Sequence, residues 1–153
     1  MRAWRIAAAR FAELDGRGAE LYGGRWNSPG RPLVYAASAL SLAMLELLAR
    51  LPTGEVPADY VAIALEIPDE APVEAVGPGD VLGWDAPDRA ASRAYGDRWL
   101  GEGRTLALLV PALAVPQERN VLLNPRHPEM GRVRAAEPVP VIWDRRLFER
   151  RDG

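Results

Sequence analysis

The sequence contains no cysteine, no lysine and a single histidine. Without cysteine, disulfide bonds, thiol nucleophiles and thiolate metal sites are excluded. Without lysine there is no Schiff-base lysine and no P-loop lysine, and all nineteen Lys-or-Arg positions are arginine. A lone histidine, His127, argues against a histidine-based metal centre or a serine–histidine triad. No spacing of metal ligands stands out, so we expect no metal site.

Long apolar runs and a strong net charge are also absent. No stretch reaches membrane-spanning length and the N-terminus lacks a signal-peptide pattern, so we expect a cytoplasmic protein. A net charge of -2 argues against general electrostatic binding to nucleic acid or acidic membrane. The composition, 48% apolar and 26% charged over 153 residues, is typical of one folded domain. We expect this domain to span residues 1–149, followed by a short tail at 150–153.

Apolar patterning predicts many short strands and two modest helices. The proline- and glycine-rich segment 71–84 is expected to be a surface connection, and Gly96 to interrupt the second helix. Strands and helices do not alternate regularly, which argues against a doubly wound nucleotide fold. We expect an α+β domain with a bent mixed or antiparallel sheet. The expected strands are 3–7, 33–37, 60–67, 106–110, 132–136 and 139–143, and the helices end near residues 51 and 100.

A glycine-rich turn presents an arginine and a tryptophan. Residues 23–30 read Gly-Gly-Arg-Trp-Asn-Ser-Pro-Gly. Glycines let backbone amides approach an anion closely, and a guanidinium such as that of Arg25 clamps phosphate with two donors. The alternative, which residue types alone favour, is an arginine stacked on Trp26 at the loop surface. Tyr35, on the next strand, fits either a ligand wall or a core tyrosine with a satisfied hydroxyl.

Glu46 lies on a helix that is apolar around nearly its whole circumference. A carboxylate buried there costs several kcal/mol unless it is paired or hydrogen-bonded. One interpretation is an i,i+4 pair with Arg50 at the helix edge. The other is that Glu46 faces a cavity and meets a ligand hydroxyl or a cation. The helix itself leaves both open. Asn120 and Asn124 flank a short apolar segment, where asparagines more often cap turns than touch ligands.

Three segments in order resemble the core of the RES domain. They read Gly-Arg-Trp-Asn-Ser-Pro-Gly, then Val-Tyr-Ala-Ala-Ser, then Leu-Ala-Met-Leu-Glu-Leu-Leu, at residues 24–30, 34–38 and 42–48. The similarity extends over nearly the whole chain through residues 95–100, 109–111, 120–128 and 143–148. The ordered set is far more specific than any single motif. RES proteins are toxins of bacterial type II toxin–antitoxin pairs, with a fold similar to mono-ADP-ribosyltransferases.

The resemblance implies a toxin that depletes cellular NAD by cleaving the nicotinamide–ribose bond, as a glycohydrolase or phosphorylase, and thereby arrests growth. NAD would be the substrate, with no permanently bound cofactor. By motif position, the family arginine, tyrosine and glutamate fall at Arg25, Tyr35 and Glu46, which we expect to be catalytic. The implied partner is an Xre-type helix-turn-helix antitoxin that blocks the active site in a hetero-oligomeric complex and supplies any contact with DNA.

The sequence departs from the family pattern at the serine. The family serine lies in a Val-Pro-Ser-Ala pattern, whereas residues 110–113 read Val-Pro-Ala-Leu, so Ala112 takes its place. A serine hydroxyl bonded to the substrate would add about 1 kcal/mol. Two alternatives stand beside the NAD-depleting toxin: a mono-ADP-ribosyltransferase that uses the same site to modify a protein, or, because of Ala112, a weakened RES domain that mainly binds its antitoxin. Asn124 is expected to orient the Glu46 region. The expected NAD-binding residues are Arg25, Trp26, Tyr35, Ala112 and Asn124.

Overall fold

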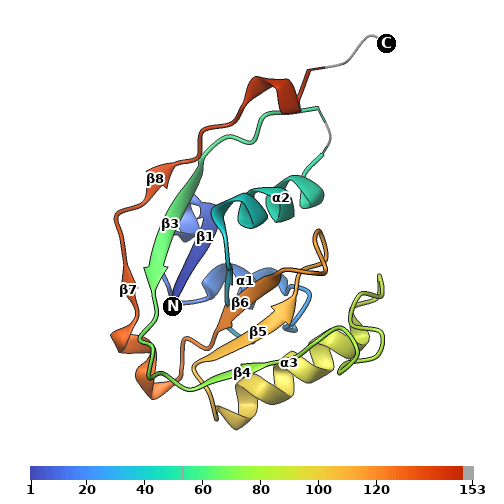
Figure 1. The fold of residues 1–153 in the computed structure, drawn as a ribbon, viewed down its shortest axis with the longest axis vertical. Helices are drawn as coiled ribbons and strands as arrows, with labels where there is room; N and C mark the ends of the chain where they lie inside the picture. Colours follow the sequence, from blue (N-terminus) through green and yellow to red (C-terminus); the bar gives the residue numbers. More distant parts are fainter. Residues whose placement is uncertain (53, 150–153) are drawn as a thin grey trace.

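A mixed sheet forms the centre of the molecule in the computed structural model, which describes residues 1–52 and 54–149 (Figure 1). Over these residues the sheet has eight strands in the order β4-β5-β6-β2-β1-β3-β7, with β8 also paired to β3. Only the β4–β5 pair is parallel. The strands are β1 (Arg2–Ala8), β2 (Val34–Ala37), β3 (Tyr60–Glu66), β4 (Val73–Ala75), β5 (Ala107–Pro111), β6 (Arg119–Leu123), β7 (Arg134–Ala135) and β8 (Val139–Pro140).

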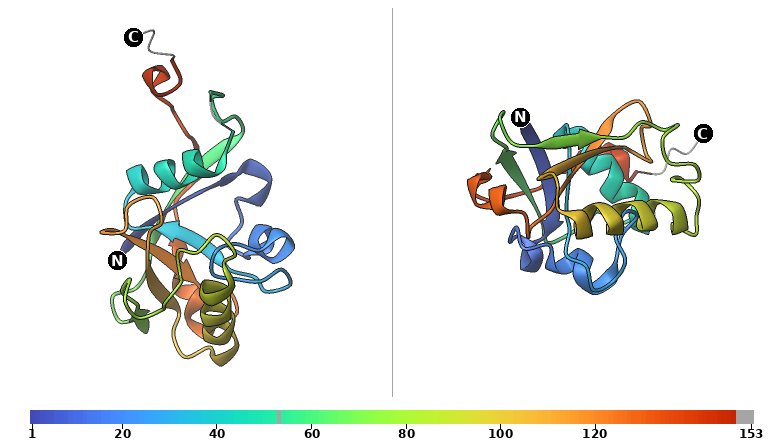
Figure 2. Two further views of the ribbon diagram at one scale, coloured as in Figure 1. Left: turned by 90° about the vertical axis from the view of Figure 1, so that its right-hand side faces the viewer. Right: turned by 90° about the horizontal axis from the view of Figure 1, so that it is seen from below.

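Helices pack at different places around this sheet. In Figures 1 and 2, α2 lies towards one end of the molecule and α3 towards the other, with β6 between them, and α1 lies beside the short turn η1. None of the helices formed by the described residues has the length and apolar character needed to cross a membrane. The helices are α1 (Arg17–Tyr22), α2 (Leu40–Arg50) and α3 (Ala90–Glu102), with 3-10 turns η1 (Ala9–Phe11), η2 (Pro128–Arg132) and η3 (Arg145–Leu147).

The sheet opens between β1 and β2. β1 pairs with β3 along its whole length, from Arg2 opposite Glu66 to Ala8 opposite Tyr60. It meets β2 at a single position, Trp4 opposite Ala37, so the two strands diverge beyond this point. The divergence leaves a space that backbone hydrogen bonds do not close.

Three apolar clusters fix the elements on either side of this opening. The largest lies on the sheet around Val34, Leu65 and Leu123, which are at most 1% exposed. A second joins the sheet to α3 through Trp26, Trp84 and Trp99. In a small third cluster, α2 packs against the sheet through Ala37, Leu42, Ala43 and Ala112. Each fully buried leucine or valine stabilises the fold by about 1.5–3 kcal/mol.

The predicted α+β class and the strands expected at 3–7, 33–37, 60–67 and 106–110 are confirmed. The prediction of a plain surface connection over 71–84 is wrong, because this segment contains β4 and buries Val76, Val81 and Trp84. The predicted interruption at Gly96 is also wrong, since α3 continues through it. In the segments 132–136 and 139–143, where strands were expected, the structure has the two-residue strands β7 and β8, which both pair with β3.

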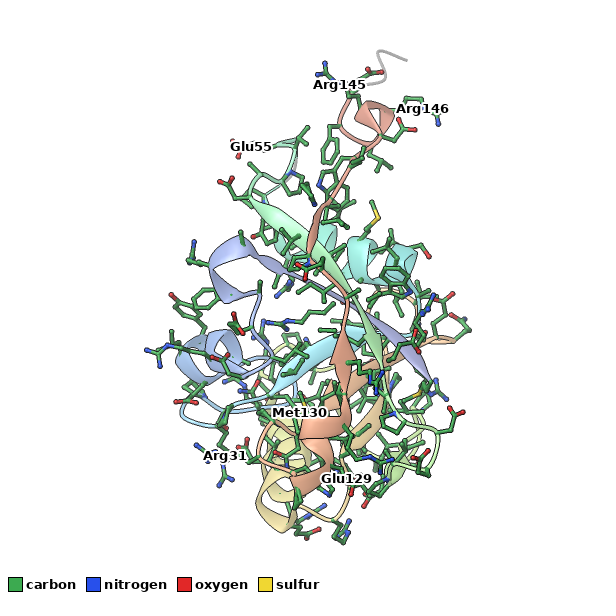
Figure 3. The ribbon with its side chains drawn as sticks, turned by 90° about the vertical axis from the view of Figure 1, so that its left-hand side faces the viewer. Arg31, Glu55, Glu129, Met130, Arg145 and Arg146 are labelled. Carbon is green, nitrogen blue, oxygen red and sulfur yellow. The ribbon has the colours of Figure 1, made fainter. Side chains whose placement is uncertain are left out.

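The two ends of the C-terminal segment lie far apart on the molecule. Figure 3 shows Arg145 and Arg146 on η3 at one end, well away from Glu129 and Met130 on η2. Both arginines are exposed. The tail expected at 150–153 lies outside the described residues.

Candidate active site

A cavity of about 480 Å³ occupies the opening between β1 and β2. Its walls come from both strands, from α2, from η1 and α1, from the loop at 23–26 and from the ends of β5 and β6. We call this cavity the groove. Of the six expected site residues, Arg25, Trp26, Tyr35 and Glu46 line the groove, whereas Ala112 and Asn124 do not. Four residues that are distant in sequence are therefore brought to one surface.

Asn27 and Tyr35 fix the loop that carries Arg25. Asn27 is fully buried, and its Nδ2 donates to the carbonyls of Ala19 at 2.9 Å and Arg31 at 2.8 Å. The Tyr35 hydroxyl donates to Asn27 Oδ1 at 2.7 Å and accepts from the Trp26 amide at 2.9 Å. Burial raises the pKa of Tyr35 well above its ordinary value of 10.0, so the hydroxyl stays neutral. Tyr35 thus combines both expected roles: its hydroxyl is satisfied and its ring lines the groove.

Helix α3 supports the same loop from behind. Ser92 Oγ donates to the Arg25 carbonyl at 2.5 Å, and Arg93 Nε donates to the Gly24 carbonyl at 2.8 Å. Gly96 lies so close to the loop that a Cβ there would be 1.7 Å from the Trp26 carbonyl oxygen. Trp26 itself stacks on Trp84, with ring centroids 6.4 Å apart and planes at 16°. The backbone that carries Arg25 is therefore held by hydrogen bonds from α3 and by the packing of Trp26.

Arg25 lines the groove from this loop. Its Nη1 donates to the carbonyls of Trp84 and Ala86, each at 3.0 Å. Within the described residues these are its only hydrogen bonds, so Nη2 and Nε keep their hydrogens for a ligand. Partial burial, followed by the charge of Arg89, lowers the pKa of Arg25, which still leaves a cation at physiological pH. Since Trp26 stacks on Trp84, the geometry differs from the expected alternative of Arg25 stacked on Trp26.

Glu46 faces the groove from α2. Its Oε1 accepts hydrogen bonds from Asn120 Nδ2 at 3.1 Å and, more weakly, from the Ala114 amide at 3.4 Å. The ion pair with Arg50 that we considered is not formed among the described residues. None of the described residues donates a hydrogen bond to Glu46 Oε2, so this carboxylate oxygen is available to a ligand.

The amide that orients Glu46 comes from Asn120, and not from Asn124 as expected. Asn124 is 4% exposed and belongs to a turn, where its Oδ1 accepts from the Arg126 amide at 3.1 Å. Asn120 stands opposite Ala37 in the β2–β6 register, which brings it beside α2. This pairing joins distant segments and has no local sequence signal, so sequence reasoning could not choose between the two asparagines.

Ala112 lies behind the wall of the groove. It is 0% exposed and packs with Ala37, Leu42 and Ala43. Ala37 and Ala43 themselves line the groove, whereas Ala112 does not, so its methyl packs against the groove wall without facing the ligand space.

Arg5, which sequence reasoning missed, forms part of the groove floor. It is 8% exposed; Nη1 donates to the Tyr35 carbonyl at 3.3 Å and Nη2 to the Phe11 carbonyl at 3.0 Å, while Nε is buried without a partner. Burial lowers the pKa of Arg5; the charge of Asp15 opposes this shift and that of Arg50 adds to it. One sequence feature could have pointed to Arg5: it lies in the inward-facing series Ala3, Arg5 and Ala7, where an apolar residue is the norm.

The groove is strongly cationic. One carboxylate, Glu46, lines it together with five arginines: Arg5, Arg10, Arg25, Arg50 and Arg89. The described residues contain no group of three or more potential metal ligands. His127 accepts a hydrogen bond from the Glu129 amide at 3.1 Å and caps η2. The arrangement can bind an elongated anion and set one carboxylate beside it.

Comparison with known proteins gives consistent matches. A family model described as the RES domain matches residues 2–144. The chain is 41% identical to the "Prs ADP-ribosylating toxin" of Sphingobium sp., over 96% of both chains. It is 36% identical to "Toxin Res" of Yersinia enterocolitica, over 96% of this chain and 99% of the relative. Among solved structures, a chain of the M. tuberculosis MbcT–MbcA toxin–antitoxin complex has a similar fold, with a TM-score of 0.73 and 21% identity over 90% of this chain and 82% of that one.

Proposed function

The chain belongs to the RES domain family, and we propose that it is the toxin of a type II toxin–antitoxin pair that cleaves the nicotinamide–ribose bond of NAD. The observation that carries this proposal is the position of Glu46, which, of the residues that the structure describes, is the one carboxylate among the arginines of the groove. Two relatives that match over nearly the whole chain carry the word toxin in their names, and one of them is called ADP-ribosylating.

The arginines would bind the diphosphate of NAD. Arg25 and Arg5 line the groove from the loop and from β1, and among the described residues Nε and Nη2 of Arg25 have no hydrogen-bond partner. A guanidinium–phosphate contact is a charge-assisted hydrogen bond, about twice as strong as a neutral one. Trp26 and the ring of Tyr35 would form the apolar wall beside the nicotinamide ribose.

Glu46 would stabilise the charge that develops at the reacting carbon. When the bond breaks, nicotinamide leaves as a neutral molecule with the bonding electron pair, and positive charge builds on the ribose as an oxocarbenium-like state. A fixed carboxylate bonded to a ribose hydroxyl is attracted more strongly as that charge grows, which is the condition for catalysis. Because the leaving group is already cationic in NAD, no general acid is needed. Water then adds its oxygen to the anomeric carbon and releases a proton.

Asn120, Ala112 and Asn124 would act without touching the reacting bond. Asn120 holds one oxygen of Glu46 and so orients the other. For Ala112 we propose an indirect part, in which its methyl supports the layer formed by Ala37 and Ala43. For Asn124 we propose that it acts only through the turn that follows β6.

A second candidate is ADP-ribosyl transfer to a protein, which the name of the Sphingobium relative favours. The same groove would cleave the same bond, and a protein side chain would replace water as the acceptor. In either case the proposed partner is an Xre-type antitoxin. A carboxylate-bearing tail of such a partner would fit the cationic groove, since a guanidinium binds carboxylate as it binds phosphate.

Incubation of the purified protein with NAD labelled in its adenylate part tests the proposal and separates its forms. Free nicotinamide with labelled ADP-ribose indicates hydrolysis, a labelled ADP-ribose phosphate that forms only in phosphate buffer indicates phosphorolysis, and label on added cellular proteins indicates transfer. Absence of all these products would contradict an NAD-cleaving function and favour a domain that mainly binds its antitoxin. The variant Ala112→Ser, compared in the same assay, measures what the family serine would add.

A further inference from the structure

One end of the groove is aromatic. The guanidinium of Arg5 donates to the Tyr35 carbonyl on one side and to the Phe11 carbonyl on the other, at 3.3 and 3.0 Å. Arg5 therefore lies between the region of Glu46 and Tyr35 and the region formed by η1 and α1. Beyond it, Phe11 and Tyr22 line the groove. A ligand that begins at Glu46 and crosses Arg5 with its anionic middle ends at these two rings.

Tyr22 presents an open ring at this end. It is 69% exposed although it lines the groove. Its ring meets that of Phe11 edge-on, with centroids 6.3 Å apart and planes at 83°. The Phe11 ring is already in contact with the Arg10 guanidinium, 4.9 Å from its centroid. Tyr22 thus offers the larger free aromatic surface, and the edge-on contact with Phe11 helps to hold its orientation.

We propose that Phe11 and Tyr22 form the base subsite of the groove, in which the ring of Tyr22 stacks on the adenine of NAD. The inference rests on the proposed function, because it assigns the far end of the same substrate. The inference follows from the order of groups along the groove. The carboxylate of Glu46 comes first, then the arginines Arg25 and Arg5, then the aromatic pair Phe11 and Tyr22. NAD has the matching order: a ribose that becomes cationic, a diphosphate and a purine.

This subsite makes the protein selective for dinucleotides. Base–aromatic stacking accepts any purine face and typically strengthens binding about tenfold or more per base. Nicotinamide mononucleotide contains the same scissile bond but has no adenine, so it cannot use Tyr22. The benefit of Tyr22 must therefore appear with NAD and vanish with the mononucleotide.

The test compares three variants on two substrates, with nicotinamide release as the readout. Tyr22→Ala is expected to lower kcat/KM for NAD about tenfold through KM, and to leave kcat/KM for nicotinamide mononucleotide unchanged. Tyr22→Phe keeps the ring and should retain the wild-type value with NAD. The control Leu21→Ala removes a neighbouring α1 side chain that is 47% exposed and does not line the groove, and should change neither substrate.

Equal losses on both substrates, or an unchanged KM for NAD in Tyr22→Ala, would overturn the inference. A failure of the proposed function gives a different result, namely no nicotinamide release by the wild-type protein. In that event the affinity for adenosine diphosphate ribose is measured calorimetrically on wild-type and Tyr22→Ala proteins. A weakening of about tenfold in the variant supports the base subsite independently of catalysis, and equal affinities, or no binding to either protein, contradict it.

Discussion

Asn120 Nδ2 donates a hydrogen bond of 3.1 Å to Glu46 Oε1, between residues that are 74 positions apart. The bond joins β6 to α2 across the groove wall and occupies one oxygen of the carboxylate. No donor from residues 1–52 or 54–149 meets the second oxygen, which leaves it available to a ligand. Because Glu46 is the one acidic side chain that lines the groove within the described residues, this contact determines where the groove places its negative charge.

Replacement of Asn120 tests that contact through the pH profile of NAD cleavage. In Asn120→Asp a second carboxylate stands beside Glu46, and two like charges this close disfavour the doubly ionised state. A higher pH is then needed to ionise the carboxylate of Glu46, so the acidic limb of the kcat/KM profile moves to higher pH. Asn120→Ala should lower kcat about tenfold and, because the carboxylate loses one donor to its charged form, move that limb in the same direction but by less than Asn120→Asp. An Asp variant with the wild-type profile would contradict the positioning role.

Arg5→Met should separate binding from stability. Loss of charge-assisted bonds to the diphosphate is expected to raise KM for NAD about tenfold or more. The free energy of unfolding should not fall, since a buried guanidinium without a carboxylate partner is costly and methionine fills similar space. Arg2→Met, on the same strand but outside the groove, is the matched control. It should leave both KM for NAD and the free energy of unfolding nearly unchanged. An unchanged KM in Arg5→Met would exclude Arg5 from substrate binding.

Two glycines of α3 make a matched pair for stability. Gly96→Ala places a Cβ 1.7 Å from the Trp26 carbonyl oxygen, so the Arg25 loop and the helix must separate, at about 2–4 kcal/mol. Gly101→Ala meets only the flexible end of Arg31 at 3.6 Å and should stabilise the helix by about 0.5–1 kcal/mol. Urea unfolding measures both. Similar effects of the two substitutions would contradict the close packing of α3 against the loop.

Tyr35 should make the fold sensitive to alkaline pH. Its pKa is raised above 10.0 by burial, so the folded state holds the phenolic proton more tightly than the unfolded state. This contribution to stability is complete below pH 10.0 and is lost as pH rises towards the folded-state pKa. Tyr35→Phe should cost about 1–3 kcal/mol at neutral pH, because Asn27 Oδ1 and the Trp26 amide lose their partner.

The two proteins are compared by urea unfolding at about pH 8 and at about pH 10.5. The wild-type protein should lose more stability between these two conditions than Tyr35→Phe does. Equal losses would show that the Tyr35 hydroxyl titrates as it does in water.

Local patterns in the sequence predict the strands and helices whose own residues decide their structure. β1 and β3 follow from alternation and apolar character, and α2 from its apolar face. β4 escaped prediction because three residues in a proline- and glycine-rich stretch become a strand only through pairing with β5. The sequence predicts a helix break at Gly96, because no local pattern shows that the absence of a Cβ there makes room for the backbone of Trp26.

The same distinction holds for the site. Arg25, Tyr35 and Glu46 could be named from an ordered set of motifs, and the structure places all three on one groove. Arg5 and Asn120 enter the groove through strand pairings between distant segments, and such registers have no short-range signature. Their importance depends on packing, which the sequence alone does not display.

The most direct test of the central claim is the rate of nicotinamide release from saturating NAD by wild-type and Glu46→Gln proteins. Glutamine keeps the shape of the side chain and removes the charge, so thermal unfolding should be nearly unchanged. If Glu46 stabilises the oxocarbenium-like state, the wild-type protein releases nicotinamide and kcat falls by about 10²–10³ or more in the variant. A folded Glu46→Gln protein that turns over NAD at the wild-type rate would contradict this account.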